Sequence, residues 1–305
     1  MRAGRLSSPR PGSPWRESSS NATSPFPPSA TRTMPGLIAD TASSAAGTSP
    51  RGYAVFLLST DGSIEATREA IGRVIGLKMD GAFISLGWAM SRPEAGVERL
   101  IERGIAVVGV SGGSYDLAGV DCFLNDEEGG GSQIGTYLHR LGHRQVLFVG
   151  PVGSRAAEKR YSGLASVFGG LAKGDGTTLE QVPTQGYTAS AAYDAVQSAL
   201  SHRQHFTAMV AFNDAVATGA LSDNGLVVPD DVSFVSFGSD HRDFARPRIT
   251  SVTFEEERIA ALAANCLIDR IKGTASGPSS HEYLPLTLTV RESSKRTRGA
   301  SARKP

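Results

Sequence analysis

The sequence predicts an α/β protein built from two doubly wound lobes, and three observations lead to this prediction. Short apolar runs rich in β-branched residues alternate with longer segments of helical periodicity. This alternation is typical of a mostly parallel sheet that is covered by helices. The chain of 305 residues is also longer than one domain of ordinary size, and each half has the same β-α order.

Strands are predicted wherever a short apolar run is bounded by turn residues. These runs are PGLIAD (35–40), YAVFLLS (53–59), GAFISL (81–86), AVVGVS (106–111), QVLFVG (145–150), AMVAF (208–212), VSFVSFG (232–238) and LTLTV (286–290). Helices are predicted at 63–79, 94–103, 128–141, 155–172, 188–201, 214–222 and 255–272. Gly142 is expected to end one helix in a left-handed conformation, and His143 behind it is expected to cap that helix rather than to act as a catalytic base.

Composition and termini narrow the class of protein. Residues 1–35 and 294–305 are rich in Ser, Arg and, at the N-terminus, Pro, so we expect disordered tails, the second of them basic. The net charge is only +1, and Cys122 and Cys266 stand far apart, so neither a cationic surface nor a disulfide or metal site is expected. No run approaches the roughly 18 apolar residues of a membrane span, and the N-terminus lacks the apolar core of a secretion signal. A cytoplasmic protein without cofactor is expected.

The usual signatures of enzymes on doubly wound sheets are missing. GxSxG, GxxxxGK[ST] and HExxH do not occur, and no GxGxxG stands in the first β-α turn. The glycine run 129–131 is interpreted as the start of a helix rather than a phosphate loop. We therefore expect a binding protein and not an enzyme.

Several segments, taken together and in order, resemble the effector-binding core of the LacI/GalR transcriptional regulators. They are GYAVFLLSTDGS (52–63), LKMDGAFIS (77–85), LIERGIAVVGV (100–110), NDEEGGGSQIGTYLHRLGHRQVLFVGP (125–151), KRYSGLASVF (159–168), AFNDAVATGAL (211–221), GLVVPDDVSFVSFGSD (225–240), ITSVTF (249–254) and LTLTVRES (286–293). The resemblance implies the periplasmic binding protein type I fold, with a ligand cleft between two Rossmann-like lobes. We expect an N-terminal lobe of residues 36–149 plus 252–276 and a C-terminal lobe of 150–251 plus 277–293.

Two segments supply the main candidates for ligand contact. In AFNDAVATGAL a buried strand delivers Asn213 and Asp214 to its carboxyl end, where open α/β sheets bind ligands. Asp214 has an alternative role as an N-cap, whereas the resemblance implies that the pair bonds sugar hydroxyls or a purine. Arg160 in KRYSGLASVF matches an arginine that reaches into the family's cleft, although by itself it also fits a solvated helix charge.

Other pocket positions depart from the family's pattern. Ser111 and Gly112 stand where sugar-binding members have Asp-Arg, and Gly238 and Ser239 stand where they have Asp-Asp. Phe254 stands at the position where these members have Gln or Arg after the hinge crossover. Ser111, Ser239 and Phe254 remain candidate ligand contacts, but a standard hexose is disfavoured because polar anchors are lost. The expected effector is a small sugar-like or nucleobase-like molecule.

The resemblance also implies partners. The family carries a helix-turn-helix that residues 1–50 do not contain, so either the reading frame has lost that domain or this is an effector domain without it. The Ser/Pro/Arg-rich composition favours the first, and operator DNA is a partner only if the full gene encodes a helix-turn-helix. A homodimer under allosteric control is expected. The alternative is a solute-binding protein of a transport system, which would need an export signal.

Overall fold

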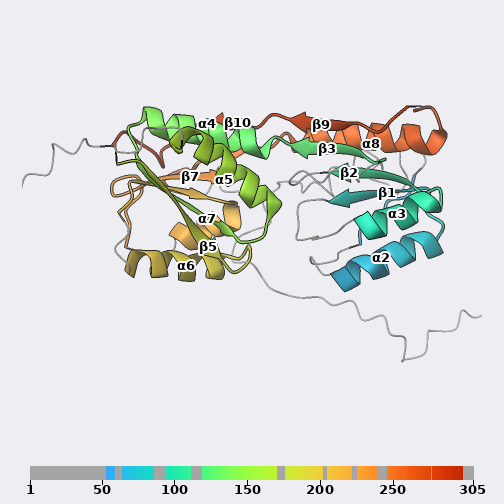
Figure 1. Ribbon diagram of the computed structural model, residues 1–305, viewed down its shortest axis with the longest axis horizontal. Helices are drawn as coiled ribbons and strands as arrows, with labels where there is room; N and C mark the ends of the chain where they lie inside the picture. The colour runs from blue at the N-terminus through green and yellow to red at the C-terminus, as the bar shows by residue number, and fades with distance from the viewer. Residues whose placement is uncertain are drawn as a thin grey trace, which may run out of the picture. The chain divides into compact units, whose positions relative to one another are not determined.

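The computed structural model describes residues 53–58, 64–85, 94–110, 119–169, 176–201, 205–221, 225–238, 246–275 and 277–297. Strands in this part of the chain form one sheet of four strands and one of six, and helices cover both (Figure 1). The predicted α/β class with mostly parallel sheets is confirmed.

The four-stranded sheet is parallel and has the order β1-β2-β3-β9. Its strands are β1 (Gly81–Ser85), β2 (Ala106–Val110), β3 (Asp121–Asn125) and β9 (His281–Leu284), and its helices are α2 (Ile64–Gly76), α3 (Glu94–Glu102) and α8 (Glu256–Lys272). Successive residues of a strand point to opposite faces. Accordingly, Val108 and Phe123 pack against α8, while Val107 and Leu124 lie in the cluster of α2 and α3.

The six-stranded sheet has the order β10-β8-β7-β6-β4-β5, in which β10 alone is antiparallel to its neighbour. Its strands are β4 (Gln145–Pro151), β5 (Thr178–Thr184), β6 (Ala208–Ala211), β7 (Ser233–Phe237), β8 (Thr250–Thr253) and β10 (Thr287–Thr289). Helices α4 (Glu127–Arg140) and α5 (Arg155–Phe168) cover one face, and α6 (Ala189–Ser201) and α7 (Asp214–Leu221) cover the other (Figure 1). Phe148, Phe234 and Phe237 are fully buried between these layers.

All seven predicted helices form within a few residues of their expected bounds, but the strands are less complete. Strands β3, β5, β8 and β9 were not predicted, because they are short or carry polar residues. Conversely, residues 53–58 form no strand, and Phe56 and Leu57 are 67% and 76% exposed. The predicted strand 35–40 lies outside the described residues.

The expected lobe boundaries need correction. Residues 145–149 were assigned to the first lobe, but β4 pairs with β5 and β6 in the six-stranded sheet, and α4 packs on α5. In the opposite sense, β9 was assigned to the second lobe and pairs with β3. The chain therefore changes sheets between β3 and α4, between β8 and α8, and between β9 and β10. Periodicity could not locate these points, because a strand's sheet is decided by a partner distant in sequence.

The basic C-terminal segment is bound to the six-stranded sheet for four residues longer than expected. Lys295 donates its backbone N–H to Ser233 Oγ at 3.0 Å, and Thr297 donates its own to the carbonyl of Leu141 at 3.0 Å. Ser294 bonds the Tyr137 hydroxyl at 2.8 Å. The expectation of a tail from residue 294 is therefore wrong for 294–297, whereas residues 298–305 and the expected N-terminal tail lie outside the described residues.

Candidate functional site

The carboxyl ends of β6, β7 and β8 bring aromatic and polar residues to one edge of the six-stranded sheet. Phe212, Asn213 and Asp214 follow β6, Gly238 follows β7, and Phe254 follows β8. Parallel neighbours in the order β8-β7-β6 end at the same edge. This edge is where open α/β sheets bind ligands.

Asn213 caps the helix that follows β6. Its Oδ1 accepts the backbone N–H of Val216 at 2.8 Å, which satisfies one of the amides left unpaired at the start of α7. Asp214 is already the first residue of that helix. The capping role that the sequence left open for Asp214 therefore belongs to Asn213.

The Asp214 carboxylate lies against the backbone at Gly238. A Cβ built on Gly238 would come within 2.6 Å of Asp214 Oδ1, and real Cβ atoms do not make so short a contact. Gly238 also has a φ of +123°, a conformation that side chains disfavour. The glycine thus makes room for the carboxylate at the carboxyl edge of the sheet.

Arg160 enters the same edge from α5 and is only 5% exposed. Its Nε donates to Glu127 Oε2 at 2.6 Å, its Nη2 donates to Glu127 Oε1 at 3.0 Å, and its Nη1 donates to the carbonyl of Phe212. The guanidinium carbon lies 4.3 Å from the ring centre of Phe212, 4.5 Å from that of Phe237 and 5.4 Å from that of Phe254. The alternative of a solvated helix charge is therefore wrong.

Glu127, the partner of Arg160, was not predicted. It is the first residue of α4, where the helix dipole favours an acidic side chain, and it is 3% exposed. Charged residues are almost never fully buried unless paired. A buried arginine therefore implies a carboxylate nearby, but a separation of 33 residues left no local pattern that identifies Glu127.

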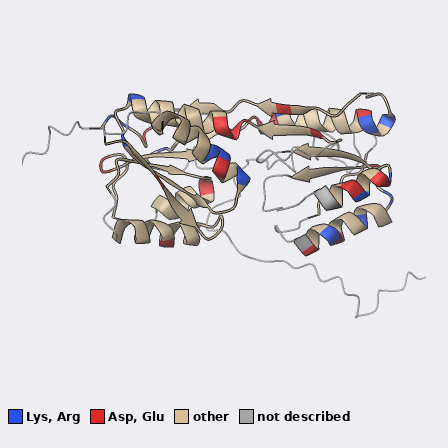
Figure 2. Ribbon diagram, viewed as in Figure 1, with Lys and Arg blue, Asp and Glu red and all other residues tan. Residues whose placement is uncertain are grey.

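Glycines of both α4 and α5 allow this pairing. A Cβ on Gly163 would lie 2.7 Å from the Ser132 backbone nitrogen, and one on Gly131 would lie 3.0 Å from the Cα of Gly163. Helices α4 and α5 therefore meet backbone to backbone, and Figure 2 shows acidic residues at the start of α4 beside basic residues of α5. Within the glycine run 129–131, Gly131 has a role beyond the helix start, because together with Gly163 it sets the distance between the two helices that carry the ion pair.

The remaining candidates are only partly placed. Phe254 is half-buried beside Arg160. Ser111 and Ser239 lie outside the described residues, as does Gly112. The structure thus brings together Arg160, Asn213, Asp214 and Phe254 of the expected set, with Glu127 added.

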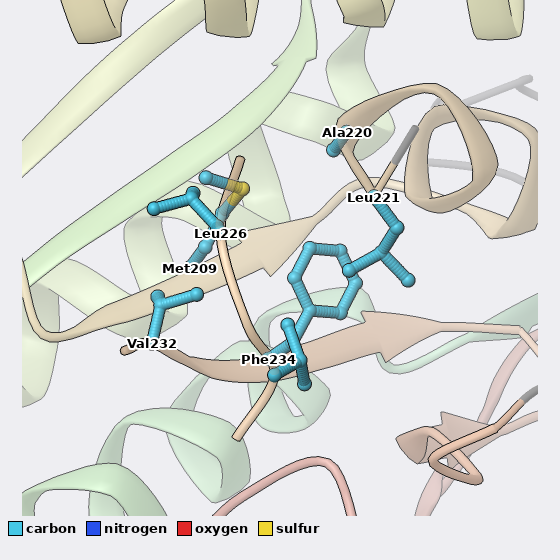
Figure 3. A pocket seen from close by; sticks show the side chains of 7 residues that line it. Met209, Ala220, Leu221, Leu226, Val232 and Phe234 are labelled. Atoms are coloured by element: carbon cyan, nitrogen blue, oxygen red, sulfur yellow. The ribbon is translucent and has the colours of Figure 1, made fainter. Parts of the chain in front are cut away.

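A small cavity lies in the other half of the same sheet. Figure 3 shows it among apolar side chains that include Met209 and Phe234, near the amino ends of β6 and β7, and its volume is about 10 Å³. A cavity of that size holds about one water molecule, and an apolar one stays dry. It is a packing gap and not a ligand site.

His143 is buried and joins the C-terminal segment to the sheet. Its Nδ1 lies 2.9 Å from Thr207 Oγ1 and its Nε2 lies 3.0 Å from the Lys295 carbonyl, which can only accept. Burial lowers the pKa of His143, helped by the charge of Arg144 and opposed by the bond to Lys295. Near the end of α4, the backbone N–H of His143 donates to the Leu138 carbonyl at 3.1 Å, and Arg144 Nη1 donates to the His139 carbonyl at 3.2 Å. His143 thus caps α4 through its backbone and shares this role with Arg144, while Gly142 has the predicted left-handed φ of +91°.

Other chemistry in the described part of the chain is sparse. No group of three or more His, Cys, Asp or Glu side chains is arranged to hold a metal ion there. Burial and the neighbouring Asp121 raise the pKa of the Cys266 thiol to about 11, so little of the reactive thiolate forms near neutral pH. Among the helices that are described, none combines the length and apolarity needed to cross a bilayer.

Comparison with known proteins places this geometry in a family. A family model described as periplasmic binding protein-like domain matches residues 136–294, just over half of the chain. The chain belongs to the periplasmic binding protein-like family. Among related proteins of this type, the HTH-type transcriptional repressor PurR of Edwardsiella ictaluri (strain 93-146) is 26% identical over 241 residues, which are 77% of this chain and 69% of the repressor.

Solved structures agree with this family. A LacI family transcriptional regulator from Enterococcus faecium with bound ribose has a TM-score of 0.66 at 24% identity, over 80% of this chain and 88% of that one. A periplasmic binding protein/LacI transcriptional regulator from Alkaliphilus metalliredigens QYMF, complexed with D-xylulofuranose, has a TM-score of 0.70 at 22% identity, over 85% and 92%. The predicted periplasmic binding protein-like fold and the resemblance to LacI-type effector cores are confirmed.

Proposed function

We infer that this chain is the effector-binding core of a LacI-type transcriptional regulator. The relationship to the PurR repressor over 77% of the chain carries this conclusion. The geometry supports it, because Arg160, Asn213, Asp214 and Phe254 gather at the sheet edge that binds ligands in this type of fold.

The effector that we propose is a small molecule of the sugar or nucleobase type. The Enterococcus faecium and Alkaliphilus metalliredigens proteins are described with ribose and D-xylulofuranose. In our chain Asp214 would accept hydroxyl or amine protons, while the half-buried ring of Phe254 would pack on an apolar face of the effector. No group at this edge is required to form a covalent bond, so we propose binding without catalysis.

Binding would act on transcription by a population shift. An effector that contacts one arrangement of the two sheets better than another changes their populations by its differential affinity. In a cytoplasmic homodimer that carries a helix-turn-helix, this shift would change the spacing of the DNA-binding parts. The alternative, a solute-binding protein of a transport system, is less favoured because the matched relatives are transcriptional regulators.

Replacement of Asp214 by alanine tests the proposed site. A thermal-shift screen of monosaccharides and nucleobases would identify an effector, and calorimetry would then compare the parent with Asp214→Ala. Loss of a charge-assisted hydrogen bond of about 1.5–3 kcal/mol should weaken binding at least about tenfold. Because Asn213 supplies the helix cap, the variant should stay folded.

Asp194→Ala is the matched control, since Asp194 is an exposed carboxylate on α6 of the same sheet's helical layer. It should bind as the parent does. Equal affinities of the parent and Asp214→Ala would place the pocket elsewhere.

A further inference from the structure

Glu127 neutralises the buried cation of the proposed site. In the part of the chain that the structure describes, Arg160 is the one lysine or arginine that is buried. Glu127 engages two of its nitrogens at 2.6 and 3.0 Å, and the carbonyl of Phe212 engages the third. The guanidinium fork that suits a carboxylate or phosphate is therefore already occupied by a carboxylate of the chain itself.

The described surroundings of this pair are aromatic. The rings of Phe212, Phe237 and Phe254 face the guanidinium. The carboxylate of Glu127 offsets the charge of Arg160 at 2.6 Å, and the carboxylate of Asp214 follows β6 at the same edge. An anionic group arriving here would find the guanidinium of Arg160 already paired and the carboxylate of Glu127 beside it, at a site of low dielectric where repulsion is stronger than in water.

We propose that Glu127 determines the chemical class of the effector: the site accepts a neutral or cationic molecule and rejects one that carries a phosphate or carboxylate. This inference rests on the proposed function, because it assigns selectivity to the same sheet edge. Glu127 acts through Arg160 and by its own charge. Because it already neutralises the buried cation, the effector need not supply a negative charge.

Paired ligands test this selectivity. Ribose is compared with ribose 5-phosphate, and adenine with adenosine monophosphate, by thermal shift and calorimetry on the parent and on Glu127→Gln. The parent should bind only the uncharged member of a pair. In Glu127→Gln, affinity for the anionic member relative to the neutral one should rise by about tenfold or more. A purely structural role of Glu127 would instead weaken both members alike, and that result would overturn the proposal.

Glu128→Gln is the matched control. Glu128 is the next residue of α4 and pairs with Lys159 of α5 at 2.8 Å, but both side chains are 47% exposed. This variant loses the same unit of charge without exposing a buried cation, so it should keep the parent's selectivity. A rise equal to that of Glu127→Gln would reduce the effect to net charge and contradict the proposal.

Two further outcomes are informative. If Glu127→Gln does not fold, the parent alone decides: tighter binding of the phosphorylated member of either pair overturns the proposal, and binding of the uncharged member alone supports it. If the parent binds no member of either pair, the proposed effector site is in question, while inorganic phosphate still tests Glu127. Phosphate should raise the Tm of Glu127→Gln and leave that of the parent unchanged, and an equal response of the two proteins would overturn the assignment.

Discussion

The carboxylate of Asp214 lies against the backbone of Gly238 at the ends of two neighbouring strands, so close that a methyl group at position 238 would lie 2.6 Å from Oδ1. From the sequence, Gly238 is interpreted as the loss of an acidic anchor that sugar-binding members carry. The geometry gives the substitution a positive role, because the glycine leaves room for the carboxylate that follows β6. The acidic group at this edge thus comes from the neighbouring strand.

Gly238→Ala should destabilise the fold and disturb the site together. The φ of +123° disfavours any side chain, at a cost of about 1–3 kcal/mol, and the clash with Asp214 adds to it. Urea unfolding gives the first effect and calorimetry with the effector gives the second. Gly273→Ala is the control, since φ is +69° there and nothing lies within 4 Å of the added Cβ. If Gly238→Ala and Gly273→Ala both lost effector binding, the loss could not be assigned to the contact between position 238 and Asp214.

Much of this architecture was predictable, and the exceptions have a common cause. Helical periodicity is a property of one segment, so the seven helices of the described residues are all predictable from the sequence. Strand β5, TLEQVPT, alternates poorly and becomes a strand because it pairs with β4. Residues 53–58 have the apolar pattern of a strand but no partner in the described chain.

The site was predictable to the same extent. Asn213, Asp214 and Arg160 could be placed at a sheet edge because order along the chain determines which strand precedes them. Glu127 could not, since the pairing depends on two helices that cross at glycines. Which of Asn213 and Asp214 caps α7 also depends on one hydrogen bond that either residue type can make.

Gly163→Ala should separate the helices that hold the ion pair. The added Cβ would meet the Ser132 nitrogen at 2.7 Å and the Glu128 carbonyl, both backbone atoms that cannot rotate away. Overpacking of this kind costs about 1–3 kcal/mol, which urea unfolding would measure. Gly72→Ala in α2 should do the opposite, because it has open space and gains about 0.5–1 kcal/mol of helix stability. Equal stability of Gly163→Ala and the parent would show that α4 and α5 can accommodate the added methyl group.

Two C-terminal truncations should differ in stability. Removing residues 294–305 deletes the bonds of Lys295 to Ser233 and His143 and that of Thr297 to Leu141, and each net bond contributes about 0.5–1.5 kcal/mol. Removing only residues 298–305 keeps all of them. The longer truncation should therefore lower the urea midpoint, and the shorter one should leave it unchanged. Identical midpoints for the two proteins would mean that this segment adds nothing to stability.

His143 should make the fold sensitive to mild acid. Burial lowers its pKa in the folded chain, whereas in the unfolded chain it titrates near the ordinary value of about 6.5. Below that value the unfolded chain binds more protons than the folded one, so the free energy of unfolding should decrease as pH falls from 6.5 through the folded pKa. The stability that the neutral His143 contributes should be fully present above about pH 6.5.

Urea unfolding across this pH range should show a steeper loss of stability for the parent than for His143→Gln, because only the parent must expose or protonate a buried imidazole. His139→Gln removes another histidine from the same end of α4 and should keep the parent's slope. Equal slopes for the parent and His143→Gln would assign the acid sensitivity to other groups.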